Sequence, residues 1–235
     1  MNKGRLYLIP TLIADGNVDS VIPEGNLSII RRLDHFIVEE VRTARRFLIK
    51  AGTLRNINEI TFLIFNEHSK EIILDSYLAC TQDGHDIGLL SEAGAPCIAD
   101  PGSMIVKEAH EMGIRIVPLS GPSSIMLALM ASGFNGQNFS FLGYLPADKE
   151  SRVKKIKELE RTIQEKDQTQ IFIETPYRNL QLFDSLISVC REGTLLCIAT
   201  GISGADEQIE SKSIGAWKKS RPDINKRPSI FLLFH

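Results

Sequence analysis

Short apolar segments alternate with longer amphipathic ones along most of the chain, and this alternation predicts an α/β fold. In the first half, the apolar runs have the length and the flanking turn residues that are typical of strands. The predicted strands there are Arg5–Pro10, Phe36–Glu39, Thr61–Phe65, Ile87–Ser91 and Ile114–Leu119. Helical patterns fall between them at Thr43–Lys50, Lys70–Thr81 and Pro101–Met112.

A second series of the same kind follows. Its predicted strands are Asn138–Leu145, Gln170–Glu174, Leu195–Thr200 and Ser229–Phe234. Its predicted helices are Ser123–Ser132, Lys149–Glu165 and Arg178–Arg191. The charged segment 148–167 keeps Val153, Ile156, Leu159 and Ile163 on one side, which is the pattern of an amphipathic surface helix.

The two series meet at Ser120-Gly121-Pro122, where a predicted strand ends shortly before a new helix. We therefore expect two α/β domains, residues 1–119 and residues 120–235. No internal repeat or low-complexity segment interrupts either of them.

Three predicted helices follow predicted strands and have a proline near their first position. They start at Asp100-Pro101-Gly102, Gly121-Pro122-Ser123 and Thr175-Pro176-Tyr177, each with a capping residue before the proline. Helix N-termini at the carboxyl ends of strands direct backbone N–H groups toward the usual ligand crevice of an open α/β sheet. The alternative interpretation is that these are efficient helix starts without a ligand.

Composition places the chain among ordinary globular proteins. Its 235 residues are 43% hydrophobic and 24% charged, which argues against disordered, collagen-like and disulfide-rich classes. No apolar stretch has the length of a membrane span, and the N-terminus lacks the pattern of a secretory signal. Four cysteines in apolar surroundings indicate reduced thiols, so we expect a cytoplasmic protein. The net charge of -2 gives no overall attraction to nucleic acid, so any RNA contact needs a local patch.

Several common chemistries lack their sequence signatures. The chain has no G-x-x-x-x-G-K-[ST] or G-x-G-x-x-G phosphate loop, no H-E-x-x-H and no G-x-S-x-G. The five histidines show no metal-ligand spacing, so no metal is expected. Kinase, classical dehydrogenase, metallohydrolase and serine hydrolase functions are thereby disfavoured.

Four segments carry a more specific pattern and occur in a fixed order. They are Leu90–Gly102 (LSEAGAPCIADPG), Ile116–Ser124 (IVPLSGPSS), Phe141–Pro146 (FLGYLP) and Glu174–Arg178 (ETPYR). Weaker matches are Leu6–Ala14, Val38–Arg42 and Glu67-His68. Over residues 4 to about 200, the chain resembles the tetrapyrrole methylase superfamily, the class III S-adenosylmethionine (SAM) methyltransferases. Within it, the chain is similar to the ribosomal small subunit methyltransferase I group.

The chain departs from the pattern of that group at several positions. Glu92 stands where the group has aspartate, Ala95 where it has threonine, and Val41 and Thr43 replace residues of its A-E-D-T-R-H-T segment. The loop Gly201–Glu207 has neither the arginine nor the lysine of the group's R-E-L-T-K segment. The group also has a further C-terminal segment beyond the position matched by His235.

The resemblance implies that SAM lies in a cleft between the two α/β domains, with residues 1–119 on the substrate side and residues 120–235 completing the cofactor site. The cofactor-binding residues that it implies are Pro10, Ser91, Gly94, Ala95, Pro96, Ile98, Gly121, Ser123, Ser124, Ile173 and Pro228. The small residues of the Gly94–Pro96 turn suit a close backbone approach, and serines at a helix start can offer hydroxyl and N–H donors. Ordinary helix capping is the alternative role of the two serines.

Transfer of a methyl group to a hydroxyl requires alignment of the reactants and removal of a proton. By position in the matched segments, Glu40, Glu92 and Glu174 are the carboxylates that could accept this proton, with Arg178 beside the last. A structural role as a hydrogen-bond acceptor is the alternative for each glutamate.

For an RNA substrate, the best basic patch is Arg42, Arg45, Arg46 and Lys50, whose spacing places them on one face of a helix. Arg178 could add a phosphate contact to this patch. The alternative is a solvated basic helix balanced by Glu39 and Glu40.

The resemblance implies methylation of a cytidine ribose 2′-hydroxyl in small-subunit ribosomal RNA by a homodimeric enzyme. One alternative is a methylase of a tetrapyrrole precursor or another small molecule. It is disfavoured because Ile9–Gly16 resembles the first loop of the ribosomal group rather than a glycine-rich loop. The other alternative, suggested by the altered loop after Thr200 and the missing C-terminal segment, is a SAM-binding or RNA-binding module with little turnover.

Overall fold

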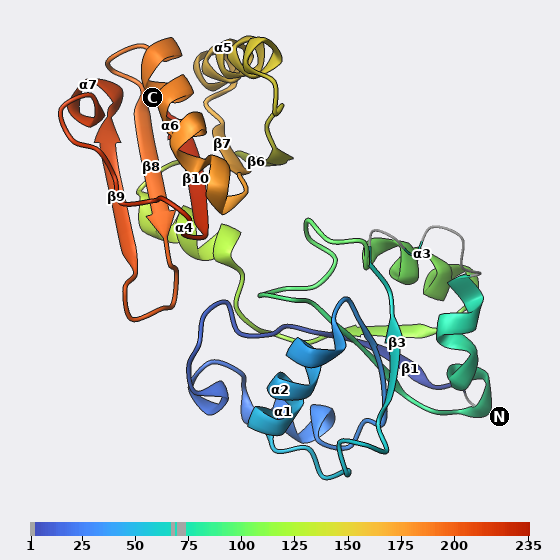
Figure 1. The fold of residues 1–235 in the computed structure, drawn as a ribbon. Coiled ribbons are helices and arrows are strands. Elements are labelled where there is room, and N and C mark those ends of the chain that lie inside the picture. Colours follow the sequence, from blue (N-terminus) through green and yellow to red (C-terminus); the bar gives the residue numbers. More distant parts are fainter. Residues whose placement is uncertain (1–2, 67–68, 70–73) are drawn as a thin grey trace. The chain divides into compact units, whose positions relative to one another are not determined.

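The computed structural model describes residues 3–66, 69 and 74–235. The weak match Glu67-His68 and the first four residues of the predicted helix Lys70–Thr81 lie outside these residues. The chain divides into two compact units, Met1–Ser123 and Ser124–His235, which we call the N-terminal and C-terminal units (Figure 1). None of the described helices is long and apolar enough to cross a membrane.

The described part of the N-terminal unit is built on a five-stranded sheet in which every pairing is parallel. Its strands are β1 (Arg5–Ile9), β2 (His35–Val38), β3 (Thr61–Ile64), β4 (Ile87–Leu90) and β5 (Arg115–Pro118). Their order in the sheet is β3-β2-β4-β1-β5.

Helices cover both faces of this sheet, as expected when parallel strands need long crossovers. They are η1 (Val18–Ser20), α1 (Glu24–Ile30), α2 (Val41–Ala51), the 3-10 segment η2 (Leu74–Asp83) and α3 (Ser103–Glu111). Ile9 and Phe36 pack with α1 and α2, whereas Leu6 and Ile37 pack with η2 and α3. This alternation along each strand fixes which face of the sheet each helix covers.

The strand order creates a switch point between β1 and β4. The chain leaves β1 toward β2 on one side, and leaves β4 toward β5 on the other, crossing the neighbouring strand in each case. In open α/β sheets, a ligand crevice forms at the carboxyl ends of the two strands where the connections diverge. The loops that follow Ile9 and Leu90 are therefore the expected site.

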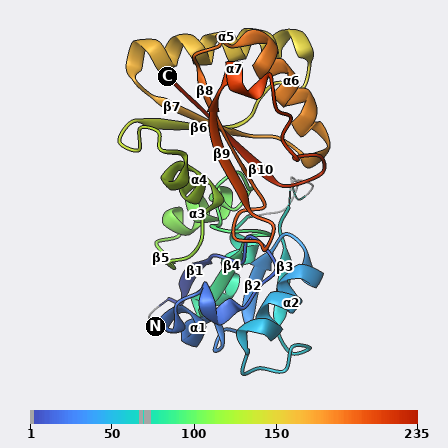
Figure 2. The same ribbon diagram turned by 90° about the vertical axis from the view of Figure 1, so that its left-hand side faces the viewer.

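The C-terminal unit contains a mixed sheet in the order β6-β7-β10-β8-β9 (Figure 1), and Figure 2 shows the same unit with β9 toward the viewer. Its strands are β6 (Phe139–Tyr144), β7 (Thr169–Ile173), β8 (Leu195–Thr200), β9 (Gln208–Ser213) and β10 (Ser229–Phe234). Only β6 and β7 pair in parallel, and their register shifts between Phe141 and Tyr144, where Gly143 has a φ of 66°.

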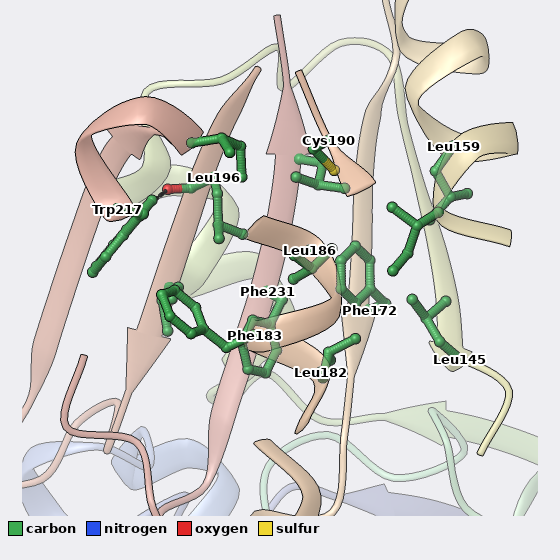
Figure 3. Close-up of a cluster of buried hydrophobic side chains, with 14 of the residues drawn as sticks. Leu145, Leu159, Phe172, Leu182, Phe183, Leu186, Cys190, Leu196, Trp217 and Phe231 are labelled. Atoms are coloured by element: carbon green, nitrogen blue, oxygen red, sulfur yellow. Dashed lines mark hydrogen bonds between the residues drawn. The ribbon is translucent and has the colours of Figure 1, made fainter. Parts of the chain in front are cut away.

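Helices flank this second sheet on both faces. They are α4 (Ser124–Ser132), α5 (Lys149–Lys166), η3 (Pro176–Arg178), α6 (Asn179–Val189) and α7 (Ile214–Trp217). Figure 3 shows the core under α5, α6 and α7, where the fully buried rings of Phe172 and Phe231 stack with centroids 6.0 Å apart. The indole N–H of Trp217 donates to the carbonyl of Leu196 at 2.8 Å, so the one polar atom of this side chain is satisfied.

The structure confirms the predicted α/β class, and each predicted strand occurs with small differences at its ends. Strand β9 and helices α1 and α7 were not predicted. Strand β9 reads Gln-Ile-Glu-Ser-Lys-Ser, and its one apolar residue gives no strand signal. Helix α1 follows Pro23, which offers no side-chain cap, and α7 has only four residues.

Candidate functional site

The loops after β1 and β4 are joined directly by hydrogen bonds. The Thr11 backbone N–H donates to the Gly94 carbonyl at 2.9 Å, and the Ser91 hydroxyl donates to the same oxygen at 2.6 Å. The Thr11 hydroxyl donates to the Ser91 carbonyl at 3.2 Å. Ser91 and Thr11 are both buried, so these bonds hold the two loops in one arrangement at the switch point.

The loop after β5 meets the same place at Gly94. This glycine has a φ of 73°, and a side-chain Cβ there would lie 3.3 Å from the Pro122 carbonyl oxygen and 3.5 Å from Ile13 Cγ1. Three loops of the N-terminal unit thus converge on a backbone position that favours glycine both by conformation and by space.

Gly121 makes an even closer approach. A Cβ at this position would lie 2.1 Å from Cγ of Pro10, well inside van der Waals contact. The buried ring of Pro10 therefore packs directly on the backbone of Gly121. The sequence predicts both residues as cofactor-binding, and the structure brings them together.

The turn that follows Gly94 has an unusual backbone. Cys97 and Ala99 have φ values of 68° and 62°, a region that residues with side chains seldom occupy. The Asp100 carboxylate stabilises this turn by accepting the N–H of Cys97 at 2.9 Å and the N–H of Gly102 at 2.8 Å.

Asp100 was expected to cap the following helix, and this prediction was wrong. Helix α3 begins at Ser103, with Gly102 as the N-cap residue, so Pro101 lies in the turn. Burial raises the pKa of Asp100, although the two N–H donors oppose this change. Burial and the Asp100 charge raise the pKa of the Cys97 thiol to about 12, so this cysteine is not a nucleophile at neutral pH.

The remaining residues of this turn are accessible to a ligand. Ala95 and Pro96 are half-buried, and Ile98 is 47% exposed, which is unusual for an isoleucine. The turn thus offers backbone groups and an apolar side chain at its surface.

A hollow of about 470 Å³ lies at the carboxyl ends of β1, β2 and β4, and we call it the carboxyl-end hollow. Its apolar wall includes Val38, Phe47 and Leu90. Its full lining is Thr11, Leu12, Ile13, Ala14, Asp15, Val38, Thr43, Ala44, Arg46, Phe47, Lys50, Leu90, Ser91, Glu92 and Ala93. Charged groups of both signs thus surround an apolar wall, a combination that is typical of sites for small molecules.

The four residues of the predicted basic patch do not all lie at the carboxyl-end hollow. Arg46 and Lys50 line the carboxyl-end hollow, and Lys50 Nζ lies 3.2 Å from Asp15 Oδ1. Arg45 instead donates to the side-chain oxygen of Asn58, and exposed Arg42 is not part of the lining. Two of the four cations therefore face the hollow.

Glu40 is the N-cap residue of α2. Its carboxylate accepts the N–H of Arg42 at 2.8 Å and the N–H of Thr43 at 3.0 Å. These backbone donors, that of Arg42 first, lower the pKa of Glu40 below its ordinary value of 4.5. The cap consequently stabilises the fold above pH 4.5, and this contribution is lost as the pH falls through the lower folded-state pKa.

Glu92 lies beside this cap and lines the carboxyl-end hollow. Its Oε1 accepts the hydroxyl of Thr43 at 2.8 Å, while the same hydroxyl lies 2.9 Å from the Glu40 carbonyl. The side chain of Glu92 is exposed, so one carboxylate oxygen is oriented by Thr43 and the other is open to a ligand.

In the C-terminal unit, buried Glu174 and partly exposed Arg178 form an ion pair at the end of β7. Glu174 Oε1 accepts the N–H of Thr175 and both Nε and NH2 of Arg178, at 2.6 to 3.0 Å. The glutamate side chain is 1% exposed, and its Oε2 has no hydrogen-bond partner among the described residues. A buried oxygen without a donor is costly, so Oε2 is a natural acceptor for a bound group.

Four further predicted residues lie near the ends of elements. Half-buried Ile173 ends β7, and exposed Pro228 precedes β10. Ser124 is the first residue of α4, and Ser123 comes directly before it. Pro176 occupies the first helical turn of η3, as the sequence predicts.

The sequence did not single out the loop Thr11–Asp15 or Phe47 as part of a site. Both line the carboxyl-end hollow. The available signal was the position of the loop directly after a predicted strand, because loops at that end of a parallel sheet carry the ligand.

A family model described as Tetrapyrrole (Corrin/Porphyrin) Methylases matches residues 19–216 of the chain. Relatives named "Ribosomal RNA small subunit methyltransferase I" occur in several bacteria. The one from Escherichia coli O157:H7 is 31% identical over 99% of this chain and 77% of its own length. Those from Vibrio cholerae and Pseudomonas aeruginosa are each 30% identical, over 98% and 90% of this chain and 76% and 71% of their own lengths.

Two solved structures share the fold. The methyltransferase CobJ superposes with a TM-score of 0.65 at 15% identity, over 99% of this chain and 94% of its own. The uroporphyrin III C-methyl transferase from Thermus thermophilus gives 0.62 at 13% identity, over 99% of this chain and 98% of its own. At these identities the likeness concerns the fold.

The contact between Gly121 and Pro10 predicts a strong effect of one added methyl group. We expect Gly121→Ala to lower the free energy of unfolding of the N-terminal unit by about 1–3 kcal/mol, because the Cβ overlaps the proline ring. Hydrogen exchange of core amides in β1 and β5 measures this change in the N-terminal unit by itself. In the control Gly25→Ala, the Cβ meets nothing within 4 Å and lies in a helix, so stability is expected to be unchanged or higher. Equal stability of Gly121→Ala and the wild type would contradict the close approach.

Proposed function

The chain belongs to the Tetrapyrrole (Corrin/Porphyrin) Methylases family, and from this premise we propose that it transfers a methyl group from SAM to a cytidine ribose 2′-hydroxyl of small-subunit ribosomal RNA. The predicted membership of this methyltransferase family is thereby confirmed. One observation supports the proposed substrate. Over most of its length, the chain is 30–31% identical to relatives whose names refer to small-subunit ribosomal RNA.

The N-terminal unit fits a cofactor of this kind. Gly94 and Gly121 allow the loops after β1, β4 and β5 to pack closely together, because an added Cβ at either position would meet a neighbouring loop. The exposed Ile98 offers an apolar contact. The other residues that we assign to SAM in this unit are Pro10, Ser91, Ala95, Pro96 and Ser123. Bound SAM supplies an electrophilic methyl carbon, so the protein has to orient the acceptor and exclude water.

The C-terminal unit supplies the other proposed contacts. Ser124, Ile173 and Pro228 are assigned to the cofactor from the matched pattern. Glu174 Oε2 provides a buried acceptor without a donor, which supports a role for the ETPYR segment in holding a bound group.

The carboxyl-end hollow suits a nucleotide as acceptor. Arg46 and Lys50 can pair with phosphate, and Phe47 and Val38 can contact a base or a ribose. Glu92 lies in the same lining with one oxygen held by Thr43. We assign Arg46 and Lys50 to RNA binding, with Arg42 and Arg45 of the predicted patch beside them on α2.

A tetrapyrrole precursor is the alternative acceptor. One of the two solved structures, the uroporphyrin III C-methyl transferase, belongs to an enzyme of that chemistry by its name, but at 13% identity it supports the fold and not the substrate. The relatives with 30–31% identity favour RNA.

The proposal has a direct test. Purified protein is incubated with small ribosomal subunits from cells that lack it and with SAM carrying a radioactive methyl group, and the rRNA is digested to nucleosides. We expect one 2′-O-methylcytidine per subunit. Calorimetric titration with SAM and S-adenosylhomocysteine, without RNA, checks cofactor binding independently.

Each other outcome has a distinct meaning. Cofactor binding without incorporation into rRNA would contradict the proposed acceptor while retaining the methyltransferase fold. The absence of both would contradict the proposed activity and leave an RNA-binding module as the alternative. Methylation of uroporphyrinogen-like substrates would establish the small-molecule alternative.

Among the three carboxylates that the sequence offers, Glu92 is the one that lines the carboxyl-end hollow. We expect Glu92→Gln to lower kcat by about 100-fold with unchanged SAM affinity, because a positioned base contributes about that factor. Glu40→Gln is the matched control, since Glu40 also contacts Thr43 and its replacement keeps a capping oxygen. The rate of methylation in a single turnover is measured for both variants. A loss of rate in Glu40→Gln alone would show that Glu40, and not Glu92, accepts the proton.

A homodimer and a cytoplasmic location are also part of the proposal. Met126 and Met130 on α4 are 44% and 75% exposed, and such apolar side chains are typical of a surface that another chain covers. We expect sedimentation at twice the mass of one chain, and Met130→Glu to shift the protein toward the monomer. Lys154→Glu on the exposed face of α5 is the control. A monomeric wild type at micromolar concentration would refute the dimer.

A further inference from the structure

Two histidines and an aspartate meet at the amino ends of β2 and β4, opposite the carboxyl-end hollow. Asp34 directly precedes β2, His35 is its first residue, and His85 lies two residues before β4. Because Phe36 pairs with Gly88 in the sheet, the segments just before these two strands lie side by side. The fold thus joins histidines that are fifty positions apart in the sequence.

The three side chains have the spacing of metal ligands. One potential ligand atom from each lies within 4.8 Å of the others. His35 Nδ1 and Asp34 Oδ1 form a hydrogen bond of 2.7 Å, which a bound ion would replace, and the two imidazole rings have centroids 5.5 Å apart. In the part of the chain that the structure describes, no other three histidine, cysteine or acidic side chains meet this criterion.

We propose that Asp34, His35 and His85 bind a divalent transition-metal ion of the Zn²⁺ type. Imidazole nitrogens and a carboxylate oxygen are the ligands that Zn²⁺ accepts, and three protein ligands leave a coordination position for water. Two imidazoles favour this class over Ca²⁺ or Mg²⁺, which prefer oxygen ligands.

The surroundings leave room for an ion and its water. A hollow of about 360 Å³ is lined by Asp34 and His85 together with Tyr7 and Arg55. The side chains of Asp34 and His35 are 35% and 23% exposed and His85 is exposed, so an ion can reach them from solvent.

Nearby arginines lower the affinity of this site for a cation, but they do not pair with its ligand atoms. Arg5 is held by Asp86 at 2.8 Å, which neutralises its charge. Arg55 lies 3.8 Å from Asp34 Oδ2, and Oδ1 is the oxygen that faces His35. Arg32 also lines the hollow. Because these positive charges repel a metal ion, the imidazole nitrogens have to contribute much of the free energy of binding.

The proposed ion would join the amino ends of two adjacent strands. Each strand rises about 3.3 Å per residue, so the four residues of β2 separate this site from the carboxyl-end hollow by roughly 10 Å or more. The ion would therefore stabilise the sheet without contacting the proposed methyl acceptor.

The test is calorimetric titration of the untagged, reduced protein with ZnCl₂, together with thermal unfolding at each zinc concentration. We expect one site in the wild type and a midpoint of unfolding that rises with zinc. His85→Ala and His35→Ala should each weaken this site by at least about tenfold and abolish the shift of the midpoint. His110→Ala, an exposed histidine on α3, is the control and should bind as the wild type does.

Two results would overturn the proposal. One is the same zinc affinity and stoichiometry in His85→Ala and the wild type, which would place bound zinc elsewhere, for example on thiols. The other is no binding by the wild type at submillimolar ZnCl₂. Circular dichroism of the metal-free variants confirms that they fold, so loss of binding is not loss of structure.

Discussion

The close approach of the Gly121 backbone to the Pro10 ring is the constraint on which the site depends. It fixes the distance between the loops that leave β1 and β5, and the Thr11–Gly94 hydrogen bond fixes the loop of β4 against the same point. Neither contact involves a large side chain, so the geometry is set by backbone and ring alone. Because protein interiors are close-packed, a displacement of one loop would move the others.

The two ends of the N-terminal sheet carry side chains of different chemistry. At the carboxyl ends, backbone groups and small residues meet beside Arg46, Lys50 and Glu92. At the amino ends, the strand order places Asp34 beside His85. The first arrangement suits a flexible organic ligand with phosphate groups, and the second suits a small metal ion. One strand order, β3-β2-β4-β1-β5, produces both.

Much of the fold could be predicted from the sequence because apolar periodicity records which face of each element is buried. The strands around Ile9, Ile37 and Leu89 gave clear signals, whereas polar β9 did not, since edge strands have little buried surface. The glycines of the site were predicted from the family pattern. The division of the basic patch, with Arg45 on Asn58, depends on a loop position that periodicity does not contain. The pairing of His35 with His85 depends on strand order, which is also absent from local patterns.

The two edges of the C-terminal sheet have a consequence for self-association. An unpaired strand edge invites further strands and hence fibrous aggregates, and proteins discourage this with charge or with backbone irregularity. Strand β9 carries Glu210 and Lys212, whereas uncharged β6 has the register shift at Gly143 instead. A strand added to β9 would have to desolvate these charges, and a strand added to β6 would not fit the irregular backbone at Gly143. Both edges therefore carry a feature that disfavours open-ended polymerisation through this sheet.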